Sequence, residues 1–236
     1  SLFNIGALDH YGILCFTAGD VNGDGLGDAL RGRQYDGGPA YLQVALGHLG
    51  GQARQVQEIV ISEATELGDF SACAAGDVNG DGFGDVLIGI PEDFEFGSGA
   101  GKVVLYYGRP DPPPTNPTTE RFGGEAGAVS GWSVATGDVN GDGFDDVLVG
   151  EPLADEVGYT DNGTIKLYMG GQGGIAATPI WTGIGLNNNA NGGISVALGQ
   201  DINGDGYGDV VVGSHGIDYV MVWFGRADWS TAINFP

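Results

Sequence analysis

The sequence predicts an all-β fold, a β-propeller of four four-stranded blades. Three observations lead to this prediction. A ten-residue Asp-rich segment recurs four times along the chain, short apolar runs typical of strands flank each copy, and no segment has a helical period over ten or more residues. Four-stranded units repeated at a regular spacing are the pattern of blades arranged around a channel.

The repeated segment is nearly invariant in its polar positions. The four copies read GDVNGDGLGD, GDVNGDGFGD, GDVNGDGFDD and QDINGDGYGD. Their leading aspartates are separated by 57, 61 and 63 residues and are Asp20, Asp77, Asp138 and Asp201. Chance does not produce four such copies, so each copy marks one structural repeat.

The surroundings of each copy predict four strands per repeat. A run of small residues precedes the copy: ILCFTAG, FSACAAG, WSVATG or ISVALG. A β-branched run follows it (DALRGRQ, DVLIGIP, DVLVGEP, DVVVGSH), and then an apolar run that ends in Gly (YLQVALG, KVVLYYG, TIKLYMG, YVMVWFG). A weaker fourth run (VQEIVIS, TTERF, TPIWTG, STAINF) completes the unit. The small residues favour the first run as the innermost strand, where blades crowd the axis.

The spacing also predicts a closed ring. Asp20 is the twentieth residue and 35 residues follow Asp201, so joining the ends gives a spacing of 55, close to the internal spacings. We therefore expect one domain over residues 1–236, with four whole blades. The N-terminal SLFNI resembles a fourth-type strand too. We expect this spare strand either to close the ring or to pair with a neighbouring molecule.

Each Asp-rich segment contains the pattern D-x-N-x-D-G-x-x-D, which predicts a calcium loop at 20–28, 77–85, 138–146 and 201–209. Side-chain oxygens at loop positions 1, 3, 5 and 9, with the main-chain carbonyl of position 7, approach the six to eight oxygens that Ca²⁺ requires. Glycines at positions 4 and 6 allow the tight wrapping. We predict about four Ca²⁺ ions, one per blade. The predicted ligands are Asp20, Asn22, Asp24, Leu26 and Asp28; Asp77, Asn79, Asp81, Phe83 and Asp85; Asp138, Asn140, Asp142, Phe144 and Asp146; and Asp201, Asn203, Asp205, Tyr207 and Asp209.

Two other interpretations of these segments fit less well. An EF-hand needs a bidentate Glu at position 12 and flanking helices, but position 12 is Arg31, Ile88, Val149 or Val212. A plain hairpin turn needs two residues such as Asn-Gly. It does not explain carboxylates kept at three places in nine residues.

The net charge of −23, from 31 acidic and 8 basic residues, limits the possible partners. Such a polyanion repels nucleic acid and anionic lipid. No apolar run reaches the roughly 20 residues of a membrane helix, and we expect no membrane insertion. We expect an extracellular or cell-surface location, with any signal peptide already removed. Cys15 and Cys73 are the only cysteines; we expect two buried free thiols on opposite faces of their sheets.

These motifs resemble the FG-GAP repeats of integrin α-chain propellers, over essentially the whole chain. The resemblance rests on the Asp-rich loop, on Gly-x-Pro at 89–91 and 150–152, and on a glycine before each first strand, namely Gly12, Gly68, Gly131 and Gly193. The Gly-x-Pro motif is missing at 32–34 and 213–215. The resemblance implies calcium in the loop between the first and second strands of a blade. Integrin rings have seven blades, so we carry over no integrin-like ligand surface.

Catalysis is not expected. His10, His48 and His215 lie far apart in the sequence, no G-x-S-x-G nucleophile elbow is present, and the carboxylate clusters belong to the metal loops. Trp132, Trp181, Trp223 and Trp229 either fill space between blades or stack on sugars. The sequon at 162–164 and the Pro/Thr-rich segment at 110–119 leave glycosylation open.

These features predict a non-catalytic extracellular calcium-binding module with a structural or interaction role. Self-association into an oligomer or filament through terminal strand pairing is the partner that we expect first. The alternative is a propeller lectin or adhesin whose loops bind glycans or cell-surface proteins.

Overall fold

The computed structural model describes residues 9–35, 40–49, 54–61, 71–91, 98–110, 117–156 and 158–230. Every regular element in these ranges is a β-strand, and the predicted all-β class is confirmed. The same ranges contain no helix long and apolar enough to cross a membrane.

The described strands form four antiparallel sheets, one for each Asp-rich repeat. Each sheet is a meander in which consecutive strands are hydrogen-bonded neighbours. The first contains β1 (Asp9–Gly19), β2 (Asp28–Tyr35), β3 (Ala40–Leu46) and β4 (Arg54–Ile61). The second contains β5 (Ser71–Gly76), β6 (Asp85–Ile90), β7 (Lys102–Tyr106) and β8 (Thr119–Phe122). The third contains β9 (Ser133–Gly137), β10 (Asp146–Glu151), β11 (Thr164–Tyr168) and β12 (Trp181–Ile184). The fourth contains β13 (Gly192–Gln200), β14 (Asp209–Ser214) and β15 (Tyr219–Trp223).

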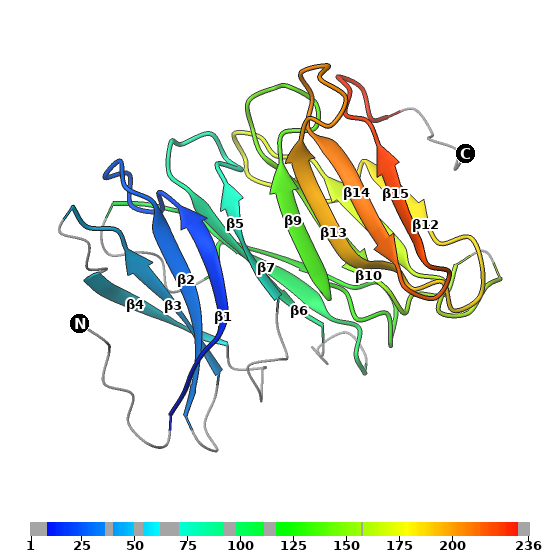
Figure 1. Cartoon of the computed structure of the whole chain (residues 1–236), viewed down its shortest axis with the longest axis horizontal. Coiled ribbons are helices and arrows are strands. Elements are labelled where there is room, and N and C mark those ends of the chain that lie inside the picture. The colour runs from blue at the N-terminus through cyan, green and yellow to red at the C-terminus, as the bar shows by residue number, and fades with distance from the viewer. Residues whose placement is uncertain are drawn as a thin grey trace.

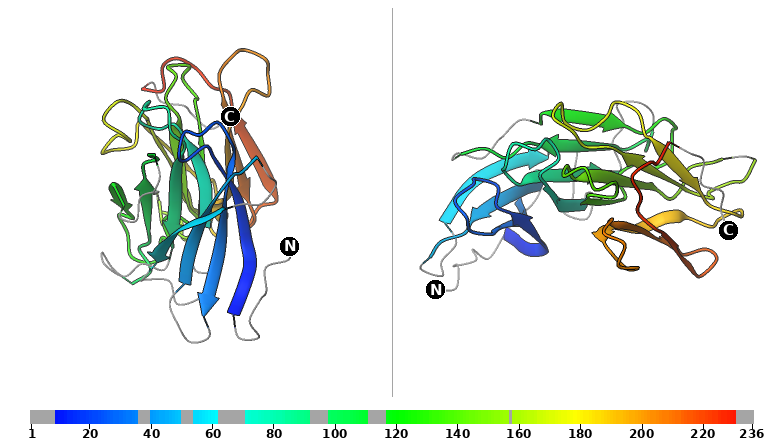
Figure 2. Two further views of the ribbon diagram at one scale, coloured as in Figure 1. Left: turned by 90° about the vertical axis from the view of Figure 1, so that its left-hand side faces the viewer. Right: turned by 90° about the horizontal axis from the view of Figure 1, so that it is seen from above.

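The sheets follow one another along an arc, as in a propeller (Figure 1). The first strands of successive sheets, β1, β5, β9 and β13, pack side by side, as their small residues predict. The first and fourth sheets lie at opposite ends of the arc, and the view from above shows the two ends apart (Figure 2). The described residues therefore do not form the closed four-blade ring that the spacing predicts.

Each sheet has a leading face toward the preceding sheet in the sequence and a trailing face toward the next. Residues alternate between the two faces along every strand. On β10, Val147 and Val149 are on the leading face and pack against Leu87 and Leu105 of the second sheet. Leu148, on the trailing face, packs against the fourth sheet. The core of the molecule is therefore a series of apolar layers between sheets.

Three of the four tryptophans fill the last of these layers. Trp181, Trp223 and Trp229 are buried. The ring centroid of Trp181 lies 5.2 Å from that of Trp223 and 5.7 Å from that of Trp229, both in edge-to-face geometry. These three residues pack between blades and are not positioned to stack on sugars. Trp132 is exposed.

Several other predictions concern single positions. Cys15 pairs in register with Arg31 and Cys73 with Leu87. The side chains of both cysteines lie outside the described part of the structure, so the expectation of two buried free thiols stays a prediction. Asn162 of the sequon is buried: its Oδ1 accepts from Glu156 N and its Nδ2 donates to Gly185 O. The fold therefore does not present Asn162 for glycosylation.

Three predicted segments lie wholly or almost wholly outside the described residues. They are the N-terminal SLFNI, the fourth-strand run STAINF, and the centre of the Pro/Thr-rich segment at 111–116.

Candidate metal loops

The four Asp-rich loops connect the first strand of each sheet to the second, at the same end of every sheet (Figure 1). The aspartate at position 5 of each loop is exposed, whereas the aspartate at position 9 is buried. The predicted ligands thus divide into an exposed group on the loop and one buried carboxylate at the start of the second strand.

The carboxylate at position 1 organises the backbone of its own loop. In the second loop Asp77 Oδ1 accepts from Gly80 N (2.7 Å) and Asp81 N (3.0 Å), and Asp77 Oδ2 accepts from Gly82 N (2.8 Å). The bonds from positions 5 and 6 recur in the other three loops. Because the glycines at positions 4 and 6 have positive φ in all four loops, the backbone N–H groups can turn inward to this carboxylate.

Positions 3 and 5 are joined to each other in the same way in every loop. Asn79 Nδ2 donates to Asp81 Oδ2 (2.9 Å), and Asn79 Oδ1 accepts from Asp81 N (2.9 Å). Phe83 N, at position 7, donates to Asp81 Oδ1 (3.0 Å). The four loops therefore have one common conformation, with the oxygens of positions 1, 3 and 5 gathered on one short turn.

The buried aspartate at position 9 joins its loop to the third strand. In the second sheet Asp85 Oδ2 accepts from Val78 N (3.0 Å) and Asp85 Oδ1 accepts from Gly108 N (2.8 Å). The other sheets repeat both bonds, with Gly47, Gly170 and Gly225 as the glycines. Gly47 directly follows the third strand of its sheet, and each of the other three glycines comes one residue later. A Cβ at Gly47 would lie 2.6 Å from the carbonyl oxygen of position 8, so a larger residue does not fit there.

Sequence reasoning missed this second role of position 9. The apolar runs that all end in Gly were its only signal.

Burial of the position 9 carboxylate has an electrostatic cost. Burial is the main reason that the pKa of Asp85 is raised to about 7; the N–H donors of Gly108 and Val78 lower it, and the charges of Asp81 and Asp77 raise it. The pKa of Asp146 is raised to about 7 for the same reasons. Each of these loops thus concentrates negative charge around a buried carboxylate, a condition that a bound divalent cation relieves.

The described residues contain no group of three or more His, Cys, Asp or Glu side chains that could hold a metal ion in their present positions. The donors nevertheless fit Ca²⁺ in kind, because carboxylate and amide oxygens are its ordinary ligands. The side chains at positions 1, 3, 5 and 9 of each loop would hold such an ion. The positive charge of the ion would attract both the exposed carboxylates of the turn and the buried carboxylate at the start of the second strand.

Successive loops are also joined to one another. In the first junction Gly84 N donates to Asp20 O (2.7 Å) and Arg109 N donates to Val21 O (3.0 Å). The next two junctions repeat these bonds at Asp77 and Val78 and at Asp138 and Val139. The ring at position 7 covers the position 4 glycine of the preceding loop: Phe83 lies over Gly23, Phe144 over Gly80 and Tyr207 over Gly141. Every loop is therefore part of an interface between sheets.

Repeated antiparallel sheets in an arc, each with an Asp-rich loop between its first two strands, define a propeller-like repeat protein. The FG-GAP repeat family matches residues 71–106, 130–168 and 192–216. These ranges begin at or near the first strand of the second, third and fourth sheets, and the first sheet, where Gly-x-Pro is missing, is unmatched. The chain contains FG-GAP repeats over these three ranges and is similar to integrin alpha chains, and the predicted resemblance is confirmed.

The most informative relatives are all integrin alpha chains. The chain is 32% identical to integrin alpha-5 of Xenopus laevis over 65% of its length, 33% identical to integrin alpha-PS2 of Drosophila melanogaster over 65%, and 32% identical to human integrin alpha-6 over 60%. The matches span only 15%, 11% and 12% of those relatives. The chain therefore matches only a small part of the length of these relatives.

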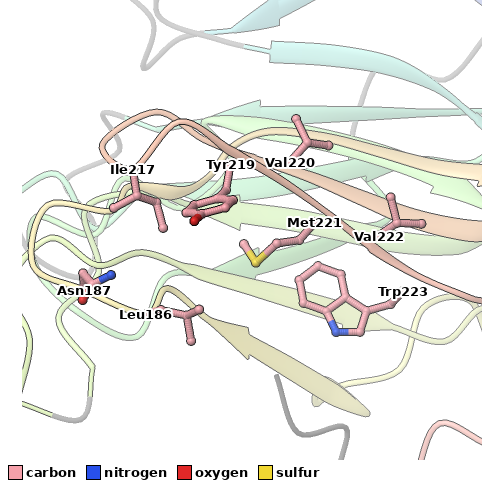
Figure 3. A pocket seen from close by; sticks show the side chains of 8 residues that line it. All are labelled: Leu186, Asn187, Ile217, Tyr219, Val220, Met221, Val222 and Trp223. Atoms are coloured by element: carbon pink, nitrogen blue, oxygen red, sulfur yellow. The ribbon is translucent and has the colours of Figure 1, made fainter. Parts of the chain in front are cut away.

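Two of the three histidines have described side chains. His48 follows β3 and His215 follows β14, in different sheets, and both are exposed. An apolar pocket of about 500 Å³ lies beside β15 and is shown in Figure 3. Leu186, Met221 and Trp223 are among its lining residues, which include no carboxylate, His, Lys, Arg or Cys. Its chemistry is that of packing or binding.

Proposed function

We propose that the chain is a non-catalytic extracellular interaction module whose sheets are stiffened by about four Ca²⁺ ions, one in each loop at 20–28, 77–85, 138–146 and 201–209. The observation that carries this proposal is the fourfold recurrence of one loop conformation with the same oxygen donors at positions 1, 3 and 5. The aspartate at position 9 of every loop is buried, and it belongs to the same nine-residue pattern as these donors.

The similarity to integrin alpha chains supports an adhesion or interaction role on the outside of the cell. The charge of −23 supports cation binding too, since the predicted ligand positions alone contain twelve of the 31 acidic residues. We expect an affinity on the order of 10⁻⁴–10⁻³ M, as in other extracellular calcium modules.

Calorimetric titration of the full chain with CaCl₂, together with thermal melting in millimolar Ca²⁺ and in EGTA, tests the proposal. Binding to the folded state alone raises Tm by mass action. We expect about four sites and a higher Tm in Ca²⁺. No heat of binding and the same Tm in both buffers would refute calcium binding.

A matched pair of variants locates the sites. Asp81→Asn removes one exposed carboxylate at position 5, and we expect the stoichiometry to fall by about one site. Asp218→Asn removes an exposed carboxylate outside the loops, at a positive-φ position that Asn tolerates. We expect its binding to be unchanged. An equal effect of the two substitutions would show that only general charge attracts the ion.

We propose a second copy of this chain as the first partner. The N-terminal SLFNI, which resembles a fourth-type strand, is the candidate for pairing with a sheet edge of a neighbouring molecule. Light scattering of the full chain and of a variant lacking residues 1–6 tests this. A full-length monomer at all concentrations, or an oligomer that survives the deletion, contradicts it.

Protein or glycan binding through the loops remains the alternative partner. Trp132 is the one tryptophan of the chain that is exposed. Loss of glycan-array binding in Trp132→Ala would favour the lectin form of the module.

A further inference from the structure

The Asn-Gly steps of the chain are candidate sites of covalent modification. An asparagine followed by glycine loses its side-chain amide more readily than other asparagines, because glycine has no side chain to keep its backbone N away from the amide carbon. The chain contains six such steps, four of them at positions 3 and 4 of the Asp-rich loops. They are Asn22–Gly23, Asn79–Gly80, Asn140–Gly141, Asn162–Gly163, Asn191–Gly192 and Asn203–Gly204.

In five of the six steps an acceptor holds the N–H group of the glycine. Three of these acceptors are the position 1 carboxylates of the loops, and two are backbone carbonyls. The bonds are Gly80 N to Asp77 Oδ1 (2.7 Å), Gly141 N to Asp138 Oδ1 (2.7 Å), Gly204 N to Asp201 Oδ1 (2.6 Å), Gly163 N to Ala154 O (3.0 Å) and Gly192 N to Asn162 O (3.0 Å). Each of these bonds has to break before the glycine nitrogen can attack the asparagine.

Gly23, in the first loop, is the exception. Asp20 accepts the N–H groups of positions 5 and 6, Asp24 N (3.0 Å) and Gly25 N (2.7 Å), as in the other loops. Among the described residues, however, nothing accepts the N–H group of Gly23. The Gly23 nitrogen can therefore attack without first losing a hydrogen bond.

The second loop is a close comparison for the first. Both loops read GDVNGDG over the segment that contains the Asn-Gly step. The φ angle is 72° at Gly23 and 73° at Gly80, and each glycine lies under a phenylalanine ring, Phe83 or Phe144. In both loops the asparagine Oδ1 accepts the N–H group of position 5. The hydrogen bond of the glycine N–H group therefore distinguishes two otherwise similar steps.

The side chain of Asn22 is already folded back onto its own turn. Asn22 Oδ1 accepts from Asp24 N (3.1 Å), and Asn22 Nδ2 donates to Asp24 Oδ2 (3.1 Å). The first of these bonds forms an Asx turn, a hydrogen-bonded ring whose members include the amide carbon of Asn22 and the nitrogen of Gly23. The two atoms that would react are thus held on the same short ring.

We propose that Asn22 is a site of spontaneous covalent modification, at which Gly23 N and a water molecule convert the asparagine into aspartate or isoaspartate. Gly23 N forms a bond to Asn22 Cγ, the Cγ–Nδ2 bond breaks, and ammonia leaves with the proton of Gly23 N. Water then adds to one of the two carbonyl carbons of the succinimide, and opening of its ring leaves a free carboxylate. No oxidation occurs, and water is the only co-reactant. This proposal does not rest on calcium binding.

The modification would change the chemistry of the first loop. Asn22 Nδ2 is a donor to Asp24, and after the reaction a second carboxylate faces Asp24 at this place. The loop already contains Asp20 and Asp28, so the added negative charge increases repulsion within it. The isoaspartate product also adds a carbon to the backbone between positions 3 and 4. Both products would therefore loosen the turn that lies against Phe83 of the second sheet.

Incubation of the folded full chain with EGTA in heavy-oxygen water, followed by digestion in ordinary water and peptide mass spectrometry, tests the proposal. The heavy oxygen marks only the deamidation that precedes digestion. We expect Asn22 to react about tenfold faster than Asn79 or more, because the bond from Gly80 N to a charged acceptor has to break first. Asn22→Gln should remove the label from its peptide, whereas Asn79→Gln should leave the label at Asn22 unchanged.

Two controls separate the free N–H group from other causes. In urea, where the loops lose their structure, Asn22 and Asn79 should react at similar rates. In the folded chain, residue-resolved amide exchange should be about tenfold faster at Gly23 than at Gly80. Asp24 N and Asp81 N both donate to position 1 carboxylates and should exchange at similar rates.

Four results would overturn the proposal. The first is equal deamidation of Asn22 and Asn79 in the folded chain. The second is the same difference between them in urea, which would assign it to the neighbouring sequence. The third is equally fast exchange at Gly23 and Asp24, which would mean that the whole first loop opens. The fourth is a faster reaction at Asn203 than at Asn22, since Gly204 keeps its bond but has no ring over it.

Discussion

The second-last residue of β10, Gly150, provides a direct test of how tightly the sheets pack. Gly150 faces the fourth sheet, and a Cβ there would lie within 3.0 Å of both the carbonyl carbon and the oxygen of Gly193 and 2.5 Å from Ser133 Oγ. Ser133 Oγ also donates to Gly193 O across this interface (2.7 Å). Gly150→Ala therefore overlaps backbone that cannot rotate away and displaces an inter-sheet hydrogen bond.

The expected loss follows from these contacts. Overpacking against fixed atoms costs about 1–3 kcal/mol, and the displaced hydrogen bond about 0.5–1.5 kcal/mol. The lower entropy of an unfolded chain with Ala offsets about 0.4–1 kcal/mol. We expect a net loss of about 2 kcal/mol and a Tm lower by about 4–8 °C for a chain of this size.

Gly213→Ala is the matched control, because Gly213 has the same place in the fourth sheet. Its Cβ would meet only the side chain of Ser195 closely, and that hydroxyl can rotate. We expect a stability change within about 0.5 kcal/mol, or a small gain. Calorimetry of both variants at one fixed Ca²⁺ concentration gives the comparison. Equal losses, or no loss in Gly150→Ala, would show that the close packing between sheets is not as described.

Two further experiments test the junctions between sheets and the buried sequon. Phe144→Ala removes the ring that lies over Gly80 and should destabilise the chain by about 1–3 kcal/mol in urea unfolding, whereas Tyr207→Phe keeps its ring over Gly141 and should have little effect. Equal effects would exclude ring packing as the cause. Expression in a secretory host should leave Asn162 without a glycan by mass spectrometry, because both of its side-chain groups are bonded inside the fold. A glycan found there on folded protein would contradict this burial.

Much of the fold could be predicted because it depends on local pattern. The run after each loop predicts a second strand, and β6 and β10 begin at Asp85 and Asp146, the residues that close the pattern. Position 12 lies in a strand in every repeat, as the rejection of an EF-hand requires. These features need only alternation, turn residues and spacing, all of which a single sequence contains.

The features that could not be predicted depend on three-dimensional arrangement. Ring closure requires the rotation between neighbouring sheets, and residue spacing does not encode that angle. The bond from Gly108 N to Asp85 joins residues 23 positions apart. The nine-residue pattern therefore gives no sign that the aspartate at position 9 also bonds the residues after the third strand. The sequon at Asn162 is a local motif, whereas its burial is set by Gly185 of the next repeat's connection.

The bonds between loops predict where the loss of metal should be felt first. Asp77 uses its carboxylate to order its own loop and its carbonyl to accept Asp145 N of the next sheet (3.1 Å). A cation held by the proposed ligands would therefore order the surface onto which the next sheet docks, while the strands keep their own ladders. On chelation, we expect amide exchange to rise at Gly84, Asp145 and Gly208, which donate across the junctions, before it rises in β6 and β10. Hydrogen-exchange mass spectrometry in Ca²⁺ and in EGTA measures this order. Uniform acceleration over junctions and strands would mean that the loops do not transmit metal binding from one sheet to the next.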